Sequence, residues 1–302
     1  MRARGSVPSR LLFFGREAAG WCAHGCLPLE GKVDAKRPDE VKMRRVFVPP
    51  EQVGEDNIII YGDDVKHMKD VLRMKEGDKV TATCGRGTDY HCEIVSVEED
   101  QIKLSILKEE ADSSELPVKI SLYQALPKGD KLELVIQKAV ELGVYEIVPV
   151  RTKRCVVKLD DAKASKKQIR WQKISEEAAK QSGRGIVPEV LPVMDFDEAV
   201  KRASFDDHVL IPYELCEDYS LTDRLRESIM EAGIDTGTED IKIAVFIGSE
   251  GGFERSEVDF VVKNGGEEIS LGHRILRTET AAIAVLSHLM LTIEAANAAG
   301  KG

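Results

Sequence analysis

Hydrophobic residues recur with two different periods along this chain, and the period changes near residue 115. Before that point, short β-branched runs separated by Gly and Asp predict strands at residues 44–48, 58–60, 79–83, 90–97 and 101–107. One helix is expected among them, because helical spacing relates Val65, Met68, Val71 and Leu72. This pattern favours a small β-barrel packed against a single helix.

After a polar linker that ends at Pro117, strand-like and helix-like patterns alternate. Strands are expected at residues 118–125, 146–150, 188–191, 208–212, 241–247 and 268–271. Helices are expected between them at residues 132–142, 167–181, 196–203, 221–232, 256–263 and 278–298. This alternation predicts an α/β domain whose parallel sheet is covered by helices on both faces.

The first 42 residues differ from the rest in composition. They contain one four-residue apolar patch, too short for a signal peptide, and several acids that a transit peptide would lack. Met43 directly precedes the first strand-like run. We therefore expect residues 1–42 to be a disordered extension or a mis-assigned start, residues 43–114 to form the β-rich domain, and residues 117–299 to form the α/β domain.

Composition narrows the class of protein. Of 302 residues, 42% are hydrophobic and 32% are charged, and the net charge is −10. No apolar run approaches the roughly 20 residues of a membrane-spanning helix. The six cysteines include no Cys-x-x-Cys pair, which favours reduced thiols in the cytoplasm and neither a disulfide frame nor a zinc site.

Charge is unevenly distributed along the α/β part. Residues 151–184 hold eleven Lys or Arg and four acids, whereas residues 194–270 hold seven and twenty. The basic stretch suits contact with phosphates, although a solvated helix face would give the same pattern.

The strongest candidate for a ligand site is the glycine-rich segment at residues 248–252. It follows the apolar strand at residues 241–247 and precedes a helix, and three of its five residues are glycine. Glycines let the backbone approach a ligand closely, and ligands of open α/β sheets bind at the carboxyl ends of strands. The segment matches neither the Walker loop nor the dinucleotide fingerprint, and a plain tight turn is the alternative.

A second candidate, at residues 271–281, also follows a strand and opens the last helix. Thr278 is expected to cap that helix, and Glu279 suits its positive end. Arg274 and Arg277 do not suit a helix N-terminus, and therefore suggest an anionic partner. A third, dispersed group consists of surface or pairing residues, in which Lys138 and Glu141 are expected to pair with each other.

Together these features resemble the ribosomal RNA small subunit methyltransferase E family of the SPOUT superfamily. The resemblance rests on five segments in the family's order, at residues 126–131, 137–144, 177–184, 248–252 and 271–281. It extends over about residues 43–296. The chain departs from the family at Ser249 and His273, where proline is usual, so these two loops are expected to be less rigid.

The resemblance implies a PUA-like β-barrel that binds RNA, followed by an α/β domain tied in a deep trefoil knot. It also implies a homodimer with the active site at the subunit junction. The cofactor would be S-adenosylmethionine and the partner 16S rRNA or the small ribosomal subunit, with no membrane and no metal. The implied reaction is methylation of N3 of one uridine in 16S rRNA.

The family's cofactor-binding loops map onto residues 248–252 and 271–276 of this chain, and the chemistry of the implied reaction suggests further site residues. Cofactor binding is expected from Ile247, Gly248, Glu250, Gly251, Gly252, Leu271, Gly272, Arg274, Ile275, Leu276, Thr280 and Ala281. Arg277 or Arg154 is expected to stabilise the uracil anion, and Glu279 either accepts a proton or only begins the helix. RNA contacts are expected from Arg44, Arg45, Lys128, Lys131 and Arg184.

Three other interpretations stay open from the sequence. An unrelated enzyme could use the 248–252 segment to bind a nucleotide phosphate. A non-catalytic assembly factor could bind rRNA and keep a cofactor-shaped pocket. A SPOUT methyltransferase could act on another RNA base, and this interpretation ranks above the other two because the motifs are specific to one family.

Overall fold

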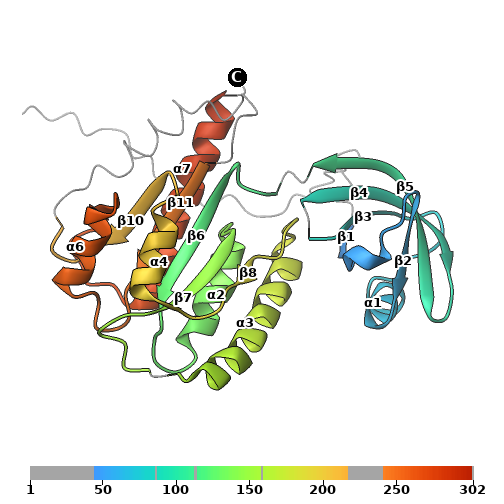
Figure 1. The fold of residues 1–302 in the computed structure, drawn as a ribbon. Helices are drawn as coiled ribbons and strands as arrows, with labels where there is room; N and C mark the ends of the chain where they lie inside the picture. Colours follow the sequence, from blue (N-terminus) through green and yellow to red (C-terminus); the bar gives the residue numbers. More distant parts are fainter. Residues whose placement is uncertain (1–43, 86, 112–113, 158, 217–240, 301–302) are drawn as a thin grey trace, which may run out of the picture. The chain divides into compact units, whose positions relative to one another are not determined.

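The computed structural model describes residues 44–85, 87–111, 114–157, 159–216 and 241–300. The expectation for residues 1–42 and the helix expected at residues 221–232 lie outside these ranges. Within them, two separate sheets form, and their strands lie close to the predicted positions (Figure 1).

The first sheet is curled and has the strand order β1-β3-β4-β5-β2. Its strands are β1 (Arg44–Phe47), β2 (Asn57–Tyr61), β3 (Lys79–Thr83), β4 (Thr88–Val97) and β5 (Gln101–Ala111). All pairings are antiparallel except that of β1 with β3. Alternating residues, such as Ile58 and Ile60 on β2, point into a buried core.

The predicted helix of this domain is shorter and less regular than expected. It consists of α1 (Asp63–Lys66) followed by a π-helical turn, His67–Val71. Val65 and Met68 are buried, whereas Val71 is 67% exposed. The wider π turn rotates Val71 away from the core that regular helical spacing would have given it.

The second sheet has the strand order β12-β10-β11-β6-β7-β8, and β9 also pairs with β7. Its strands are β6 (Val118–Ala125), β7 (Glu146–Arg151), β8 (Glu189–Val190), β9 (Met194–Asp195), β10 (His208–Pro212), β11 (Ile241–Ile247) and β12 (Glu267–Ile269). Every pairing among these strands is parallel. The segments that follow β6, β7, β10, β11 and β12 therefore meet at one edge of the sheet.

Five described helices cover the two faces of this sheet (Figure 1). They are α2 (Lys131–Glu141), α3 (Asp161–Ser182), α4 (Phe196–Ala203), α6 (Arg255–Lys263) and α7 (Thr278–Gly300). Residues of α2, α3 and α7 pack in one core, and residues of α4 and α6 pack in the other. Neighbouring strand residues divide between the faces, so Leu122 lies in the first core and Tyr123 in the second.

The helix α7 is the one described helix that is long and apolar enough to span a membrane by length and composition, over Thr278–Asn297. A core helix meets the same criteria, and Val285, Leu286 and Leu289 of α7 are fully buried against the sheet. Only 33% of its most apolar window is buried, however, and Leu291 is 60% exposed. The helix thus has one face in the core and further apolar surface outside it.

Candidate active site

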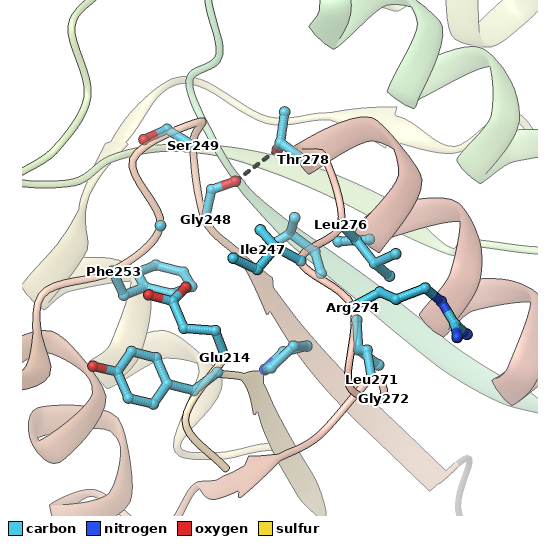
Figure 2. Close-up of a pocket in the computed structure, with 15 residues that line it drawn as sticks. Glu214, Ile247, Gly248, Ser249, Phe253, Leu271, Gly272, Arg274, Leu276 and Thr278 are labelled. Carbon is cyan, nitrogen blue, oxygen red and sulfur yellow. Dashed lines mark hydrogen bonds between the residues drawn. The ribbon is translucent and has the colours of Figure 1, made fainter.

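A pocket lies at the sheet edge where β10, β11 and β12 end (Figure 2). Its walls come from the residues at and after the end of β10, from the loop at residues 248–252 (the 248–252 loop) and from the loop at residues 270–277 (the 270–277 loop). Its volume is about 640 Å³, part of which is open to solvent. Its place at the carboxyl ends of parallel strands is typical of small-molecule sites.

Most residues expected to bind the cofactor line this pocket. Nine of the twelve do so, namely Ile247, Gly248, Gly252, Leu271, Gly272, Arg274, Ile275, Leu276 and Ala281. The described lining does not include the other three, which are Glu250, Gly251 and Thr280.

Six further residues line the pocket. Ser249 and Thr278 lie in the two segments predicted from sequence but were not expected to bind the cofactor, and four lie outside both segments, namely Pro212, Tyr213, Glu214 and Phe253. A signal for two of them was present. The strand predicted at residues 208–212 belongs to the same parallel sheet, so the rule that led to the 248–252 loop also leads to Tyr213 and Glu214. In Figure 2 the Glu214 side chain extends toward Phe253, across the pocket from Arg274.

The 248–252 loop is a tight turn. The Gly252 N–H donates to the Ser249 carbonyl at 2.9 Å, and Gly252 has a φ of 65°, which favours glycine. A Cβ on Gly248 would lie 3.0 Å from the Gly252 Cα atom. The glycine at position 248 therefore allows the two ends of the turn to meet.

Thr278 links this loop to the start of α7. Its hydroxyl donates to the Gly248 carbonyl at 2.6 Å (Figure 2) and accepts from Nε2 of Gln124 at 2.9 Å. Thr278 was predicted as the N-cap of α7, but it is the first residue of the helix. The N-cap position is that of Arg277, whose carbonyl accepts from the Ala281 N–H. The hydroxyl of Thr278 joins two loops instead of capping the helix.

Arg154 holds the 248–252 loop from another segment, the one that follows β7. Its Nη1 atom donates to the Gly251 carbonyl at 2.9 Å, and its own carbonyl accepts from the Ser249 hydroxyl at 3.3 Å. Ser249, where the family usually has proline, thus makes a hydrogen bond that proline cannot make. Loop rigidity at this position comes from a tertiary contact.

Glu250 is held by the segment that follows β6. Its carboxylate accepts from the Lys128 N–H at 3.1 Å and from Nζ of Lys131 at 2.8 Å. Partial burial acts to raise the pKa of Glu250, but the hydrogen bonds from Lys131 and from backbone N–H groups outweigh it and lower the pKa. The same hydrogen bond raises the pKa of Lys131. Glu250 is therefore ionised and anchors the loop.

The residues expected to act in the transfer lie beside these anchors. Arg277 directly follows the lining residue Leu276, and its side chain is exposed. The positive charge of Arg277 acts to lower the pKa of Lys131. Glu279 lies in the first turn of α7, with Oε2 3.8 Å from Nζ of Lys131. That oxygen is buried and has no hydrogen-bond partner among the described residues.

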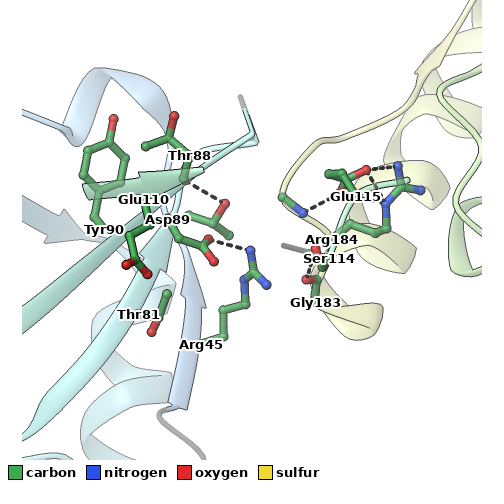
Figure 3. Close-up of polar contacts among 12 residues, drawn as sticks. Arg45, Thr81, Thr88, Asp89, Tyr90, Glu110, Ser114, Glu115, Gly183 and Arg184 are labelled. Atoms are coloured by element: carbon green, nitrogen blue, oxygen red, sulfur yellow. Dashed lines mark hydrogen bonds and ion pairs between the residues drawn. The ribbon is translucent and has the colours of Figure 1, made fainter. Parts of the chain in front are cut away.

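The residues expected to contact RNA have different surroundings (Figure 3). Arg45 forms a 2.5 Å ion pair with Asp89 within the first domain, and Arg44 begins β1. Lys128 is exposed, whereas Arg184 is buried and its guanidinium bonds Glu115 and the Val140 carbonyl. These contacts give Arg184 a structural role, because no donor of a buried, enclosed guanidinium faces the solvent.

One smaller prediction, an ion pair on α2, is confirmed. Lys138 and Glu141 form the predicted pair, at 2.8 Å. Among the described residues, no group of three His, Cys, Asp or Glu side chains could hold a metal ion.

Comparison with known proteins assigns the chain to a family. A family model described as an RNA methyltransferase domain matches residues 114–290, and one described as an RNA methyltransferase PUA domain matches residues 60–107. The ribosomal RNA small subunit methyltransferase E of Bacillus subtilis is 36% identical over 255 residues, which cover 83% of this chain and 98% of that protein. This chain belongs to the ribosomal RNA small subunit methyltransferase E family. It is an RNA methyltransferase, and the resemblance seen in its sequence is confirmed.

Solved structures of similar proteins have the same fold. The family's enzyme from Neisseria gonorrhoeae, bound to S-adenosyl methionine, matches with a TM-score of 0.65 and 30% identity over 82% of this chain and 97% of its own. A putative methyltransferase from Legionella pneumophila, in complex with the bound cofactor SAM, has a TM-score of 0.65 and 32% identity over 83% and 98%. The predicted α/β domain preceded by a PUA-like domain is confirmed. The trefoil knot stays a prediction, because strand order alone does not trace how the chain threads.

Proposed function

We propose that this protein transfers the methyl group of S-adenosylmethionine to N3 of a specific uridine in 16S rRNA, and that the cofactor binds in the pocket between the 248–252 and 270–277 loops. The observation that carries the proposal is this pocket, which nine of the twelve expected cofactor residues line. The family's enzyme from Neisseria gonorrhoeae, solved with S-adenosyl methionine, supports the choice of cofactor.

The chemistry of the pocket lining suits such a ligand. Ile247, Leu271 and Leu276 offer apolar surface to the adenine ring, and the glycine-bearing loops offer backbone N–H and C=O groups to its polar edges. When bound, the cofactor supplies a methyl group on a sulfonium, which needs no metal. The protein then has to hold donor and acceptor in line, which is a matter of positioning.

The acceptor base has to be unpaired and deprotonated at N3. A paired uridine hides N3, so we expect the base to be extruded from its helix. A cation beside the uracil oxygens would favour the anion, and Arg277 and Arg154 are the arginines next to the pocket loops. In this proposal Lys131, which pairs with Glu250 in the free protein, holds a phosphate of the RNA, and Glu279 either accepts the N3 proton or serves only to begin α7.

The basic stretch supports contact with rRNA, although part of it is paired within the protein. Arg170 pairs with Glu133 at 2.7 Å, and Lys163 pairs with Asp160 at 2.9 Å. Lys166 and Lys173 are exposed on α3, without an ion pair to any described residue. We expect this face of α3 to contribute phosphate contacts.

A homodimer is part of the proposal. Ile275 beside the pocket is 90% exposed, Leu291 on α7 is 60% exposed, and α7 keeps apolar surface outside the core. Such surface next to a site is typical of an interface. As a ribosome-modifying enzyme, the protein is expected in the cytoplasm.

The decisive experiment maps the modified nucleotide. Small subunits from a strain lacking the family's enzyme are incubated with the purified protein and S-adenosylmethionine, and 16S rRNA fragments are analysed by mass spectrometry. We expect one new 3-methyluridine. A methyl group on another base would favour the alternative substrate. Cofactor binding without any transfer would favour a non-catalytic assembly factor.

A further inference from the structure

We infer that Thr278 is a positioning residue for the cofactor, because its hydroxyl fixes the position of the 248–252 loop relative to the 270–277 loop. The inference rests on the proposed function, since it takes S-adenosylmethionine as the ligand of this pocket. It concerns a residue whose sequence context predicted only a helix cap.

The Thr278 hydroxyl both donates and accepts a hydrogen bond, and the two bonds fix its orientation. It has one proton, which goes to the Gly248 carbonyl at 2.6 Å, so its lone pair accepts from the Gln124 amide at 2.9 Å. Gln124 is fully buried at the end of β6 and donates also to the Ala125 carbonyl at 3.0 Å. The amide thus anchors Thr278 to the central strand.

This chain of hydrogen bonds connects three parts of the sheet edge. Gln124 pairs in register with Ile247, so β6 and β11 end side by side, and α7 starts above them. Gly248 begins one pocket loop, Thr278 directly follows the other as the first residue of α7, and both line the pocket. The Thr278 hydroxyl makes the short hydrogen bond between the two walls, and the Gln124 amide also donates to the Gly248 carbonyl over a longer distance of 3.5 Å.

Removing the hydroxyl should weaken cofactor binding more than it lowers the stability of the fold. Thr278 is only 4% exposed, so a valine would fill the same space, but it would leave the Gly248 carbonyl without its close donor. The 248–252 loop would keep its ties to Arg154 and Lys131. We expect it to shift on the pocket side, where the cofactor binds.

The test compares Thr278→Val and Thr278→Ser with the wild-type protein. Isothermal titration with S-adenosylmethionine gives the Kd, and thermal melting without ligand reports the fold. Valine should raise the Kd about tenfold, whereas serine, which keeps the hydroxyl, should stay within about threefold of the wild type. In methyl-transfer assays the KM for the cofactor should rise with the Kd, and kcat should change less.

Thr292→Val is the matched control, because Thr292 lies on the same helix, is 8% exposed and does not line the pocket. It should leave the Kd unchanged. Should Thr278→Val fail to fold, Gln124→Met removes the donor behind the same hydroxyl and should also raise the Kd. Unchanged binding in the folded variant would overturn the inference. A wild-type protein that binds no S-adenosylmethionine would overturn the proposed function instead.

Discussion

The guanidinium of Arg184 forms a two-point ion pair with the carboxylate of Glu115. Its Nε and Nη2 atoms lie 2.9 Å and 2.5 Å from the carboxylate oxygens (Figure 3). Its remaining nitrogen donates to the carbonyls of Val140 and Val144. Glu115 also accepts from the backbone N–H of Gly185 at 2.8 Å. The pair ties the start of the α/β domain to the end of α2 and to the segment after α3.

Replacing Arg184 with methionine should destabilise the domain strongly. A half-buried carboxylate and two carbonyls would lose their donor, the buried guanidinium, which typically costs about 3 kcal/mol of unfolding free energy. Urea denaturation measures the loss. Arg170→Met is the control, because the Arg170–Glu133 pair is on the surface and should contribute less than about 1 kcal/mol. Equal losses in the two variants would contradict the structural role of Arg184.

Replacing Gly248 with alanine should impair the pocket. The new Cβ would lie 3.0 Å from the Gly252 Cα atom, so the turn has to open at a cost of about 1–3 kcal/mol. We expect weaker binding of S-adenosylmethionine in calorimetry. Gly77→Ala, which adds a Cβ in open space at a positive φ in the first domain, should lower stability and leave binding as it is.

Replacing Arg277 with alanine should slow methyl transfer at saturating cofactor by about 10²-fold, if its charge stabilises the uracil anion. The side chain is exposed, so the fold and the Kd for S-adenosylmethionine should hardly change. Arg277→Lys keeps the charge and should retain more of the rate. Turnover at the wild-type level in the alanine variant would remove Arg277 from the mechanism.

Changing Lys166, Lys167 and Arg170 together to alanine should weaken rRNA binding and flatten its dependence on salt. Each lost phosphate contact reduces the slope of log K against log salt by about 1. Filter binding at several salt concentrations measures it. Lys201→Ala and Lys263→Ala, on α4 and α6 within the acidic stretch, are controls that should keep the wild-type slope.

The fold could be predicted from sequence where the pattern is local. The predicted bounds of the strands at residues 118–125, 208–212 and 241–247 match the observed ones. These strands are buried, so each is a mainly apolar run with polar or turn-forming residues at its ends. The predicted start of helix α3 is six residues too late. Its first turns carry little apolar periodicity, and the cap that marks their start, Asp160 accepting from the Lys163 N–H at 2.8 Å, was overlooked.

For the site, sequence predicts which backbone segments form the pocket but not how the side chains connect them. Glycine spacing points to the 248–252 loop, but nothing local shows that the Thr278 hydroxyl turns toward Gly248. Arg184 illustrates the same limit. Its partner Glu115 lies 69 residues earlier in the chain, and sequence pattern does not distinguish a buried arginine from a surface one when its partner is distant.

The position of β11 has implications for biosynthesis. This strand lies between β10 and β6, yet it is made after both of them. Until it emerges from the ribosome, the inner edges of β6 and β10 have no neighbour, and the two loops that form most of the ligand pocket have not been made. Pairing between segments so far apart in the chain is slow, and exposed strand edges invite aggregation. The nascent protein should therefore depend on chaperones until its last third is complete.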